Sequence, residues 1–333
     1  MGSFFKMFKK YKNSGKINKK RNDSMKDLRV IFMGTPDFSV PVLEELIDKC
    51  HVVMVVTQPD KEVGRKHILT PSPIKKLALE HNIEVYQPTK IRKEYEPILN
   101  TPCDIIITCA YGQIIPEAIL NYPRLGCVNV HASLLPKNRG GAPIHWTIIK
   151  GEEKTGITIM YMDKGMDSGD IIKQESIDIL DSDNVGTLHD KLSVLGAKLL
   201  METLPSIIEG TNERIKQNDD EVTFSYAIKR EEERIDYNKN GKDVINHIRG
   251  LNPWPLANML VNGEEYKVLD GYFENTKSIV NKVCDIKKDA IGIGTLDGIV
   301  YITTIKPFGK KQMSVKDFLN GVEKDEIRNW KIN

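Results

Sequence analysis

The sequence predicts an α/β protein in which a doubly wound, Rossmann-like N-terminal domain precedes a small C-terminal β-barrel of the OB-like type. Three observations support this fold class. The chain has 333 residues, more than one hydrophobic core usually holds. Up to residue 210, apolar runs of strand length alternate with amphipathic stretches, which indicates a mostly parallel sheet. Beyond residue 225, short apolar runs are separated by turns, as in a small barrel.

In the N-terminal part, each strand is expected from a buried apolar run and each helix from an amphipathic one. Helices are predicted at 40–46 and 73–81, with further helical connections between the later strands. The polar segment 58–67 is expected to be a loop. The strands are predicted at 26–33, 51–57, 83–86, 104–110 and 126–131.

The strand signal then returns twice without a long helix between the two runs. Residues 155–162 and 170–180 are therefore predicted to form a hairpin-like pair, followed by a long helix over 186–210 that stops at Gly210. A helix is expected at 241–249 in the C-terminal part. The strands of the predicted barrel are expected at 266–272, 282–287, 290–295 and 299–307.

These elements divide the chain into a first domain over 25–210, a polar linker over 211–225 and a barrel domain over 226–333. They follow a leader over 1–24 that carries eight Lys and Arg residues and one acid. The leader can be interpreted as a transit-type presequence, as an RNA-contacting arm or as upstream residues before Met25. We favour a disordered, non-catalytic tail.

Composition narrows the classes of function. The net charge is +2, but residues 25–222 carry more acidic than basic side chains, so any nucleic-acid affinity must come from a local patch. No apolar run is long enough to span a membrane. The five cysteines show no C-x-x-C spacing and the seven histidines show no H-x-x-x-H spacing, so neither disulfides nor a metal site is predicted. A reducing, cytoplasmic location fits.

The segment Asn129 to Pro136 contains the strongest chemical signal. Asn129 and His131 are two residues apart on a predicted strand, so both side chains point to the same face. An amide donor beside an imidazole suits a developing oxyanion, and ligand sites of open α/β sheets lie beyond the carboxyl ends of the strands. A satisfied core histidine is the alternative. Ser133 lacks the G-x-S-x-G context of a nucleophile, which favours a loop-capping role.

A second segment, 162–170, offers a carboxylate to orient that imidazole. Asp163, Asp167 and Asp170 are equally short and polar, and each could instead be a turn former, so spacing alone leaves the choice open. Only one glycine, Gly34, follows the first strand, and no P-loop is present. A nicotinamide or ATP site is therefore not predicted.

Two C-terminal features have both a structural and a binding interpretation. Trp254 lies between two prolines and could pack between domains or stack on a nucleotide base. Lys310 and Lys311 follow Pro307-Phe308-Gly309 at a predicted loop tip. They are either a solvated turn or a phosphate contact.

These residues, together with several longer motifs, resemble those of the folate-dependent formyltransferases, and in particular the methionyl-tRNA formyltransferases. The resemblance runs from about Lys26 to Val322. It rests on segments 32–38, 57–60 with Gly64-Arg65, 69–73, 129–136, 139–144, 167–170, 249–255, 309–311 and 317–321. The Asn–His–Asp set matches all folate-dependent formyltransferases, whereas the loop around Arg65 and the C-terminal motifs narrow the match to the tRNA enzymes.

The resemblance implies transfer of the formyl group of 10-formyltetrahydrofolate, as co-substrate, to the α-amine of methionyl initiator tRNA, for translation initiation in the cytoplasm. It implies Asn129, His131 and Asp167 as catalytic residues and a folate pocket at Ser133, Leu134, Leu135 and Pro136, with a cis bond before Pro136. It also implies tRNA contacts at Arg65, Lys310 and Lys311. Lys61-Glu62-Val63 and Lys66-His67-Ile68 depart from the more basic, Gly- and Pro-richer run common in this loop.

We also expect a monomer without metal, ATP or membrane. Other interpretations stay open from the sequence. A formyltransferase acting on a small amine, such as a glycinamide-ribonucleotide or sugar-nucleotide enzyme, would share the N-terminal site. A formyltetrahydrofolate hydrolase would use water in place of the amine. A non-catalytic RNA-binding module is the third alternative.

Overall fold

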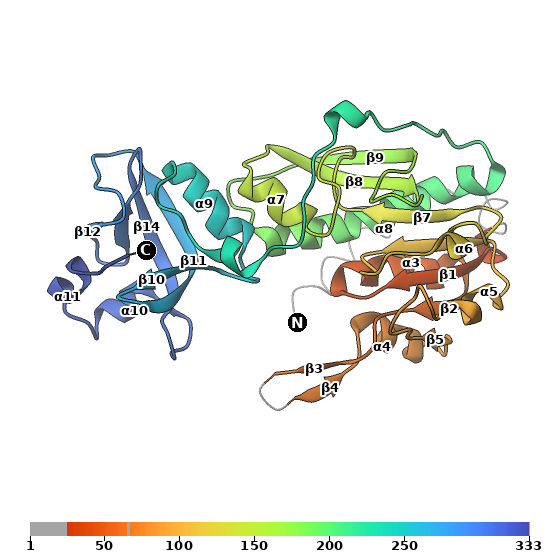
Figure 1. Ribbon diagram of the computed structural model, residues 1–333, viewed down its shortest axis with the longest axis horizontal. Coiled ribbons are helices and arrows are strands. Elements are labelled where there is room, and N and C mark those ends of the chain that lie inside the picture. Colours follow the sequence, from red (N-terminus) through yellow and green to blue (C-terminus); the bar gives the residue numbers. More distant parts are fainter. Residues whose placement is uncertain (1–24, 65–66, 333) are drawn as a thin grey trace.

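The computed structural model describes residues 25–64 and 67–332 (Figure 1). The predicted leader over 1–24 and the predicted tRNA contact Arg65 therefore lie outside the described residues. Among the helices that are described, none has both the length and the apolar character needed to cross a bilayer.

A seven-stranded sheet forms the N-terminal part, in the order β5-β2-β1-β6-β7-β8-β9. The first five strands of this order are parallel to their neighbours, whereas β8 and β9 are antiparallel. This arrangement confirms the predicted doubly wound sheet and the hairpin that follows it. The strands are β1 (Arg29–Gly34), β2 (His51–Val56), β5 (Val85–Tyr86), β6 (Ile105–Cys109), β7 (Cys127–His131), β8 (Lys154–Tyr161) and β9 (Ile171–Asp178).

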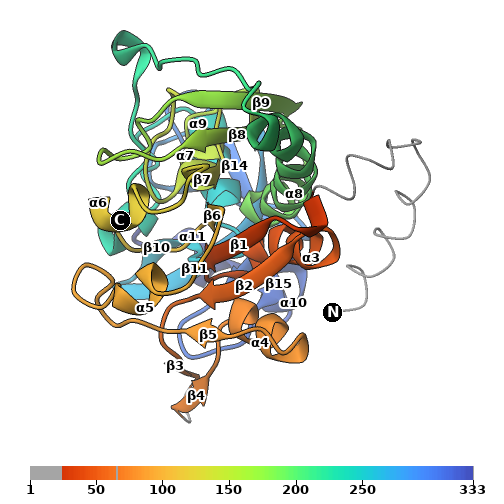
Figure 2. The same ribbon diagram turned by 90° about the vertical axis from the view of Figure 1, so that its right-hand side faces the viewer.

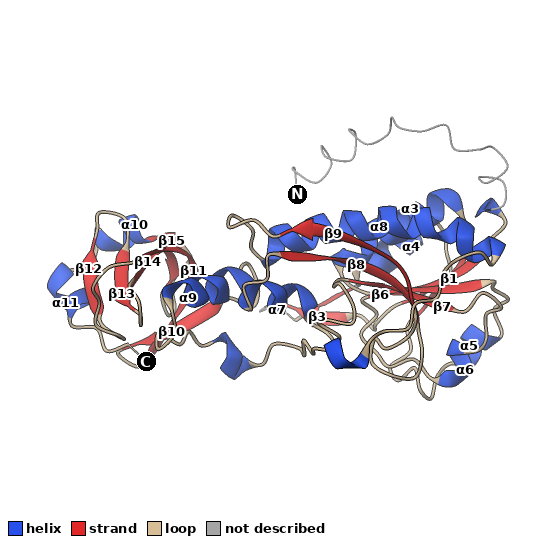
Figure 3. Ribbon diagram, turned by 90° about the horizontal axis from the view of Figure 1, so that it is seen from above, coloured by secondary structure: helices blue, strands red, loops and turns tan. Residues whose placement is uncertain are grey.

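Helices cover both faces of this sheet (Figure 3). The long helix α8 (Val185–Glu209) lies beside α3 (Val40–Lys49) on one face, as Figure 2 also shows. Because both faces are covered, the central strands are buried almost throughout, which explains their continuous apolar runs. The other N-terminal helices are α4 (Pro73–Glu80), α5 (Glu96–Leu99), α6 (Glu117–Leu120) and α7 (Pro143–Ile149), with the 3-10 turn η1 (Asp37–Ser39).

The polar segment after β2 is not a simple loop. Strands β3 (Lys61–Val63) and β4 (Ile68–Thr70) form a two-stranded hairpin that projects from the body of the domain (Figure 1). Ile68 and Leu69 are about 60% exposed on it. The side chains described at 61, 62, 68 and 69 are all exposed, so the hairpin carries no pattern of buried alternation from which the sequence could predict it.

The C-terminal part is a six-stranded antiparallel sheet with the path β10-β11-β14-β13-β12, and β15 pairs with β14. Strand β10 was absent from the sequence prediction, although Asn262 and Gly263 after it both have positive φ, as a tight hairpin turn requires. The elements are η2 (Asp219–Glu221), η3 (Arg230–Glu233), α9 (Gly241–Gly250), β10 (Ala257–Val261), β11 (Glu264–Glu274), β12 (Val283–Ile286), β13 (Ile291–Gly294), β14 (Ile299–Lys306), β15 (Met313–Ser314), α10 (Val315–Leu319) and α11 (Lys324–Arg328).

The two parts meet where α7 packs against α9. His145 Nδ1 on α7 donates a hydrogen bond to the carbonyl of Gly250, 2.8 Å away. The Trp254 ring contacts His145 and His189 edge-on, at centroid distances of 6.4 and 5.4 Å. Of the two interpretations of Trp254, these contacts favour packing between the domains.

Candidate active site

Asn129 and His131 lie on β7, as the sequence predicts. Strand β7 pairs with β6 on one side and with β8 on the other, so residues of both strands can contact its side chains. Thr108 on β6 lies opposite Asn129, and its hydroxyl donates a 2.8 Å hydrogen bond to Asn129 Oδ1. With its oxygen engaged in this way, the carboxamide keeps its N–H groups for another acceptor. The strand pair therefore presents an oriented amide donor.

His131 is only 6% exposed, and both of its ring nitrogens have protein neighbours. Nε2 lies 3.2 Å from the backbone carbonyl of Asn138. Because a carbonyl can only accept, Nε2 carries the proton in this contact. Nδ1 lies 3.7 Å from Asp167 Oδ2, which is within the distance of an ion pair but longer than a hydrogen bond.

The three carboxylates of the loop between β8 and β9 have different partners. Asp163 Oδ1 accepts hydrogen bonds from the backbone N–H of Gly165 at 2.9 Å and from the Ser168 hydroxyl at 2.6 Å, which makes it a turn former. Asp170 pairs with Arg214 at 2.9 Å. Asp167 is the one of the three that faces His131.

Asp167 is held in an uncommon backbone conformation, with φ of +49°. Its Oδ2 accepts a 2.8 Å hydrogen bond from the N–H of Gly140, in the loop that follows β7. Gly140 itself has φ of +118°, and a Cβ there would lie 2.8 Å from the carbonyl oxygen of Ser225. Glycine is therefore required where the two site loops meet.

The linker over 211–225 runs along these loops and anchors them. Gln217 donates from Nε2 to the carbonyls of Asp167 at 2.7 Å and Gly169 at 2.8 Å. Its Oε1 accepts from the Arg139 guanidinium at 2.9 and 3.0 Å. The segment expected from the sequence to be only a polar connection thus forms a wall of the candidate site.

The predicted folate residues fall into two groups. Ser133 is buried, and its hydroxyl donates to the carbonyl of Lys137 at 2.7 Å, which agrees with a loop-capping role. Leu135 is buried against other apolar side chains, and its bond to Pro136 is cis, as expected. Leu134 and Pro136 are half-buried and so are the two whose side chains reach the surface of the loop.

Two of the predicted tRNA contacts, Lys310 and Lys311, lie in the C-terminal part. Lys310 and Lys311 are exposed at a turn after β14, where Gly309 has φ of +69° and Lys310 N–H donates to the carbonyl of Pro307 at 3.0 Å. This turn connects β14 and β15 of the C-terminal sheet, whereas the candidate catalytic residues lie on β7 and on the loop between β8 and β9 of the N-terminal part.

Burial holds two titratable groups at or just after the end of β6, Cys109 and Tyr111, in their neutral form. Burial raises the pKa of the Cys109 thiol, at the end of β6, to about 12. Burial also raises the pKa of Tyr111, whose buried hydroxyl has no hydrogen-bond partner among the described residues. A thiolate nucleophile at the end of β6 is therefore disfavoured.

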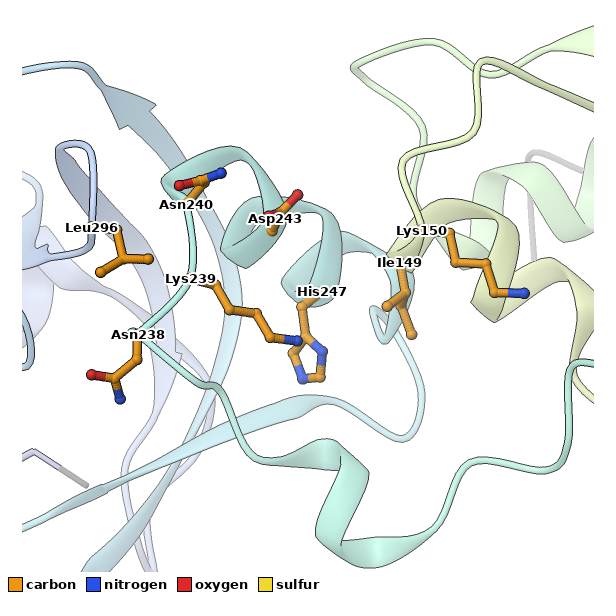
Figure 4. Close-up of a pocket in the computed structure, with 8 residues that line it drawn as sticks. All are labelled: Ile149, Lys150, Asn238, Lys239, Asn240, Asp243, His247 and Leu296. Carbon is orange, nitrogen blue, oxygen red and sulfur yellow. The ribbon is translucent and has the colours of Figure 1, made fainter.

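Two cavities are found among the described residues, and neither is lined by Asn129, His131 or Asp167. One, of about 410 Å³, lies at the domain junction and is lined by α7, α9 and Leu296 (Figure 4). The other, of about 390 Å³, lies behind the loop after β7, beside Leu134, Asn138 and Glu152. Within the described ranges, no group of three or more His, Cys, Asp or Glu side chains is arranged to hold a metal ion.

Four residues of the site were not identified from the sequence: Thr108, Asn138, Gly140 and Gln217. Thr108 left a signal, since it is a polar residue in the otherwise apolar run of β6. The positive φ of Gly140 could be anticipated from the Gly-Gly pair. Gln217 left none, because its partners are 48 to 78 positions away. Asn138 left none, because it contacts His131 through its backbone carbonyl, which no side-chain pattern reveals.

Comparisons with known proteins match this architecture over nearly its whole length. A family model described as formyl transferase matches residues 28–204, and one described as formyl transferase, C-terminal domain, matches residues 227–323. The methionyl-tRNA formyltransferase of Staphylococcus epidermidis ATCC 12228 is 51% identical over 303 residues, covering 90% of this chain and 98% of that protein. The methionyl-tRNA formyltransferase of Staphylococcus aureus MW2 is 52% identical over 300 residues, covering 89% and 96%.

Solved structures share the fold at lower identity. An N-formyltransferase from Helicobacter canadensis, in complex with folinic acid and dTDP-3-aminofucose, superposes with a TM-score of 0.64 at 20% identity, covering 86% of this chain and all of that one. HypX from Aquifex aeolicus, in complex with tetrahydrofolic acid, has a TM-score of 0.61 at 19% identity, covering 89% of this chain and 48% of that one. At these identities the likeness concerns the fold alone.

Proposed function

The chain belongs to the formyl transferase family, and we propose that it transfers the formyl group of 10-formyltetrahydrofolate to the α-amine of methionine esterified to initiator tRNA. Its similarity to the methionyl-tRNA formyltransferases extends through both domains, including the C-terminal one. This continuity favours a tRNA acceptor over a small amine, since both parts of a tRNA enzyme are present.

One observation carries the assignment of the site. Asn129, His131 and Asp167 converge where β7 ends, although 36 residues separate His131 from Asp167 in the sequence. The Asn129 carboxamide is oriented by Thr108, and the Asp167 carboxylate faces the imidazole. An amide donor, an imidazole and a carboxylate in this order supply what an acyl transfer needs for oxyanion stabilisation and proton transfer.

In the proposed mechanism the neutral amine attacks the formyl carbon, a C–N bond forms and the carbonyl electron pair moves to oxygen. Asn129 donates a hydrogen bond to this oxyanion, and His131, protonated at Nδ1, is the second donor. Asp167 balances the charge of the imidazolium and accepts the proton that the attacking amine releases. Collapse of the tetrahedral intermediate breaks the bond to N10 of the folate, and the proton that Asp167 accepted passes to N10 as it leaves.

We assign the folate pocket to the loop Ser133, Leu134, Leu135 and Pro136. Ser133 and Leu135 are turned inward and hold the loop, whereas Leu134 and Pro136 provide apolar surface for the folate ring system. The formyl donor is a substrate that arrives activated. The proposed chemistry needs no metal and no ATP.

We assign tRNA binding to Arg65 together with Lys310 and Lys311. The two lysines offer cations from an exposed turn. In this proposal residues 25–210 form the catalytic domain, 211–225 the linker and 226–333 the tRNA-binding domain. The protein acts as a monomer in the cytoplasm, where initiator tRNA is charged.

The decisive experiment measures formyl transfer from labelled 10-formyltetrahydrofolate to methionyl initiator tRNA. Charged elongator tRNA, a sugar nucleotide amine and a reaction without acceptor serve as controls. Formylation confined to the initiator tRNA is the expected result. Release of formate without an acceptor would identify a hydrolase, and preference for the small amine would identify the alternative transferase.

A further inference from the structure

We propose that Asn138 is a positioning residue that fixes the orientation and the protonated nitrogen of His131, and that it does so under the control of the linker. The inference rests on the proposed function, because it assigns a role within the same site. It concerns a residue that touches neither substrate nor reacting atoms directly. Its evidence is a set of buried polar contacts.

Asn138 is 2% exposed and has φ of +59°, a backbone conformation that asparagine tolerates better than most residues. This conformation aims its backbone carbonyl at His131 Nε2, 3.2 Å away. Its backbone N–H is used as well, since it donates to the Thr223 hydroxyl at 2.9 Å. The peptide groups on both sides of Asn138 are thereby engaged.

The side chain of Asn138 is held by hydrogen-bond donors at its oxygen and by a carboxylate acceptor at its nitrogen. Oδ1 accepts hydrogen bonds from the Lys150 ammonium and the Ser225 hydroxyl, each at 2.8 Å. Nδ2 donates to both carboxylate oxygens of Glu152, at 3.1 and 3.2 Å. Turning the amide over would place its oxygen against a carboxylate and its N–H groups against an ammonium, so one orientation is strongly preferred.

The partners of Asn138 are themselves fixed. Glu152 accepts a 2.6 Å hydrogen bond from the Thr147 hydroxyl on α7. Lys150 ends α7, and its ammonium points away from the junction cavity (Figure 4). Ser225 is fully buried in the linker, where its N–H donates to the carbonyl of Arg139 at 2.7 Å. Two segments distant from each other in the sequence, 147–152 and the linker, therefore meet on one amide.

The position of the Asn138 carbonyl determines which ring nitrogen of neutral His131 carries the hydrogen. A carbonyl at Nε2 favours the tautomer with hydrogen on Nε2, because the other tautomer would oppose two lone pairs. Nδ1 is then the nitrogen that takes up the second proton and donates it to the oxyanion as a hydrogen bond, and it is the one that faces Asp167. Without the amide anchor the carbonyl moves, and both tautomers become populated.

Two variants test this inference. Asn138→Gly removes the amide and keeps the positive φ, and Ser225→Ala removes one anchor from the linker. Asn138→Gly should lower kcat about fivefold to tenfold and Ser225→Ala about threefold, the size expected when ordinary hydrogen bonds are removed. KM for folate and for tRNA should stay within about twofold, because no substrate contact is removed.

The second readout is the His131 tautomer, measured by nitrogen NMR on histidine-labelled protein at a pH where histidine side chains are neutral. The His131 signal is assigned with a His131→Gln variant. The unmodified chain should show the Nε2–H form, Asn138→Gly a mixture and Ser225→Ala a smaller shift. Ser206→Ala is the matched control, since that hydroxyl also bonds a carbonyl, of Thr203 at 2.8 Å, but on α8.

A full kcat and an unchanged tautomer in Asn138→Gly would overturn the inference, as would a response of Ser206→Ala equal to that of Ser225→Ala. Should Asn138→Gly not fold, Ser225→Ala decides alone by the same two readouts. Absence of formyl transfer by the unmodified chain would refute the proposed function instead. The tautomer measurement would still decide the role of Asn138.

Discussion

A carboxylate lies at each end of the parallel strands, Asp104 beside two arginines at the amino end and Asp167 beside His131 at the carboxyl end. The two carboxylates have different surroundings. At the amino end, Asp104 accepts hydrogen bonds from the backbone and side chain of Arg29 and from Arg124, at 2.9 to 3.3 Å. These bonds, with that of Arg29 the largest, lower the pKa of Asp104 to about 2. At the carboxyl end, the Asp167 carboxylate accepts one hydrogen bond from the described part of the chain and faces His131 across 3.7 Å.

This difference indicates that Asp104 contributes to the stability of the fold, whereas Asp167 is placed to take part in the proposed reaction. A carboxylate saturated by two guanidinium groups stays ionised and gives up its proton-accepting capacity. Asp167 has no such guanidinium partner among the described residues, and its positive φ and the N–H of Gly140 hold its carboxylate beside His131. Substitutions at the two ends should therefore affect different measurements, which makes the comparison testable.

The largest effect is expected at the carboxyl end. His131→Ala and Asp167→Asn should each lower kcat at least ~100-fold, as loss of an oxyanion donor or of its charge partner usually does. Binding of tRNA should change little, and in Asp167→Asn the free energy of unfolding should change less than in Asp104→Asn. Steady-state kinetics with methionyl initiator tRNA provide the measurement, and near-normal turnover in either variant would remove that residue from the mechanism.

A smaller effect is expected from the linker that supports Asp167. Gln217→Leu removes two hydrogen bonds to the carbonyls of Asp167 and Gly169, so kcat should fall about tenfold. Gln217→Glu is the matched variant, because it still accepts from Arg139 but cannot donate to these carbonyls. It should behave like Gln217→Leu, whereas wild-type kcat in Gln217→Glu would show that the bond to Arg139 is what matters.

The sequence predicts those parts of the site in which the interacting residues are close together along the chain. The alternation of β7 predicted the shared face of Asn129 and His131, because strand geometry is local. Asp167 could not be separated from Asp163 and Asp170 by spacing and needed the family resemblance. The local turn of Asp163 and the ion pair of Asp170 are visible only in the fold.

The supporting residues were beyond sequence reasoning for the same physical reason. Ser225 bonds Asn138 across 87 positions, and Gln217 bonds Asp167 across 50. No periodicity connects such positions, because they meet only after the linker has folded back over the first domain. The domain order, the parallel sheet and the long helix are different, since each depends on runs that periodicity reveals.

At the amino end, Asp104→Asn should lower the free energy of unfolding at neutral pH and leave kcat unchanged. We expect about 1 kcal/mol, because solvent screens the two arginines, whose side chains are 45% and 63% exposed. The stabilisation is complete above about pH 4 and disappears as the pH falls toward 2, since the unfolded chain takes up the proton first. Denaturant unfolding from pH 7 to pH 2 should show the two proteins converging in acid; parallel curves would contradict this origin.

The smallest effect is expected at a third region, remote from both strand ends. Exposed cations at the turn after β14 should contribute to tRNA affinity through phosphate contacts, so the Lys310/Lys311 double alanine variant should weaken binding a few-fold near physiological salt. Removal of one phosphate contact should flatten the log–log salt dependence of affinity by roughly one unit. Folate binding and the free energy of unfolding should not change, because the two lysines are exposed.

Arg65→Ala, measured across the same salt series, separates the contribution of Arg65 from that of the two lysines. Unchanged slopes in both variants would mean that tRNA is held elsewhere, and the basic residues of 1–24 would be the next to replace.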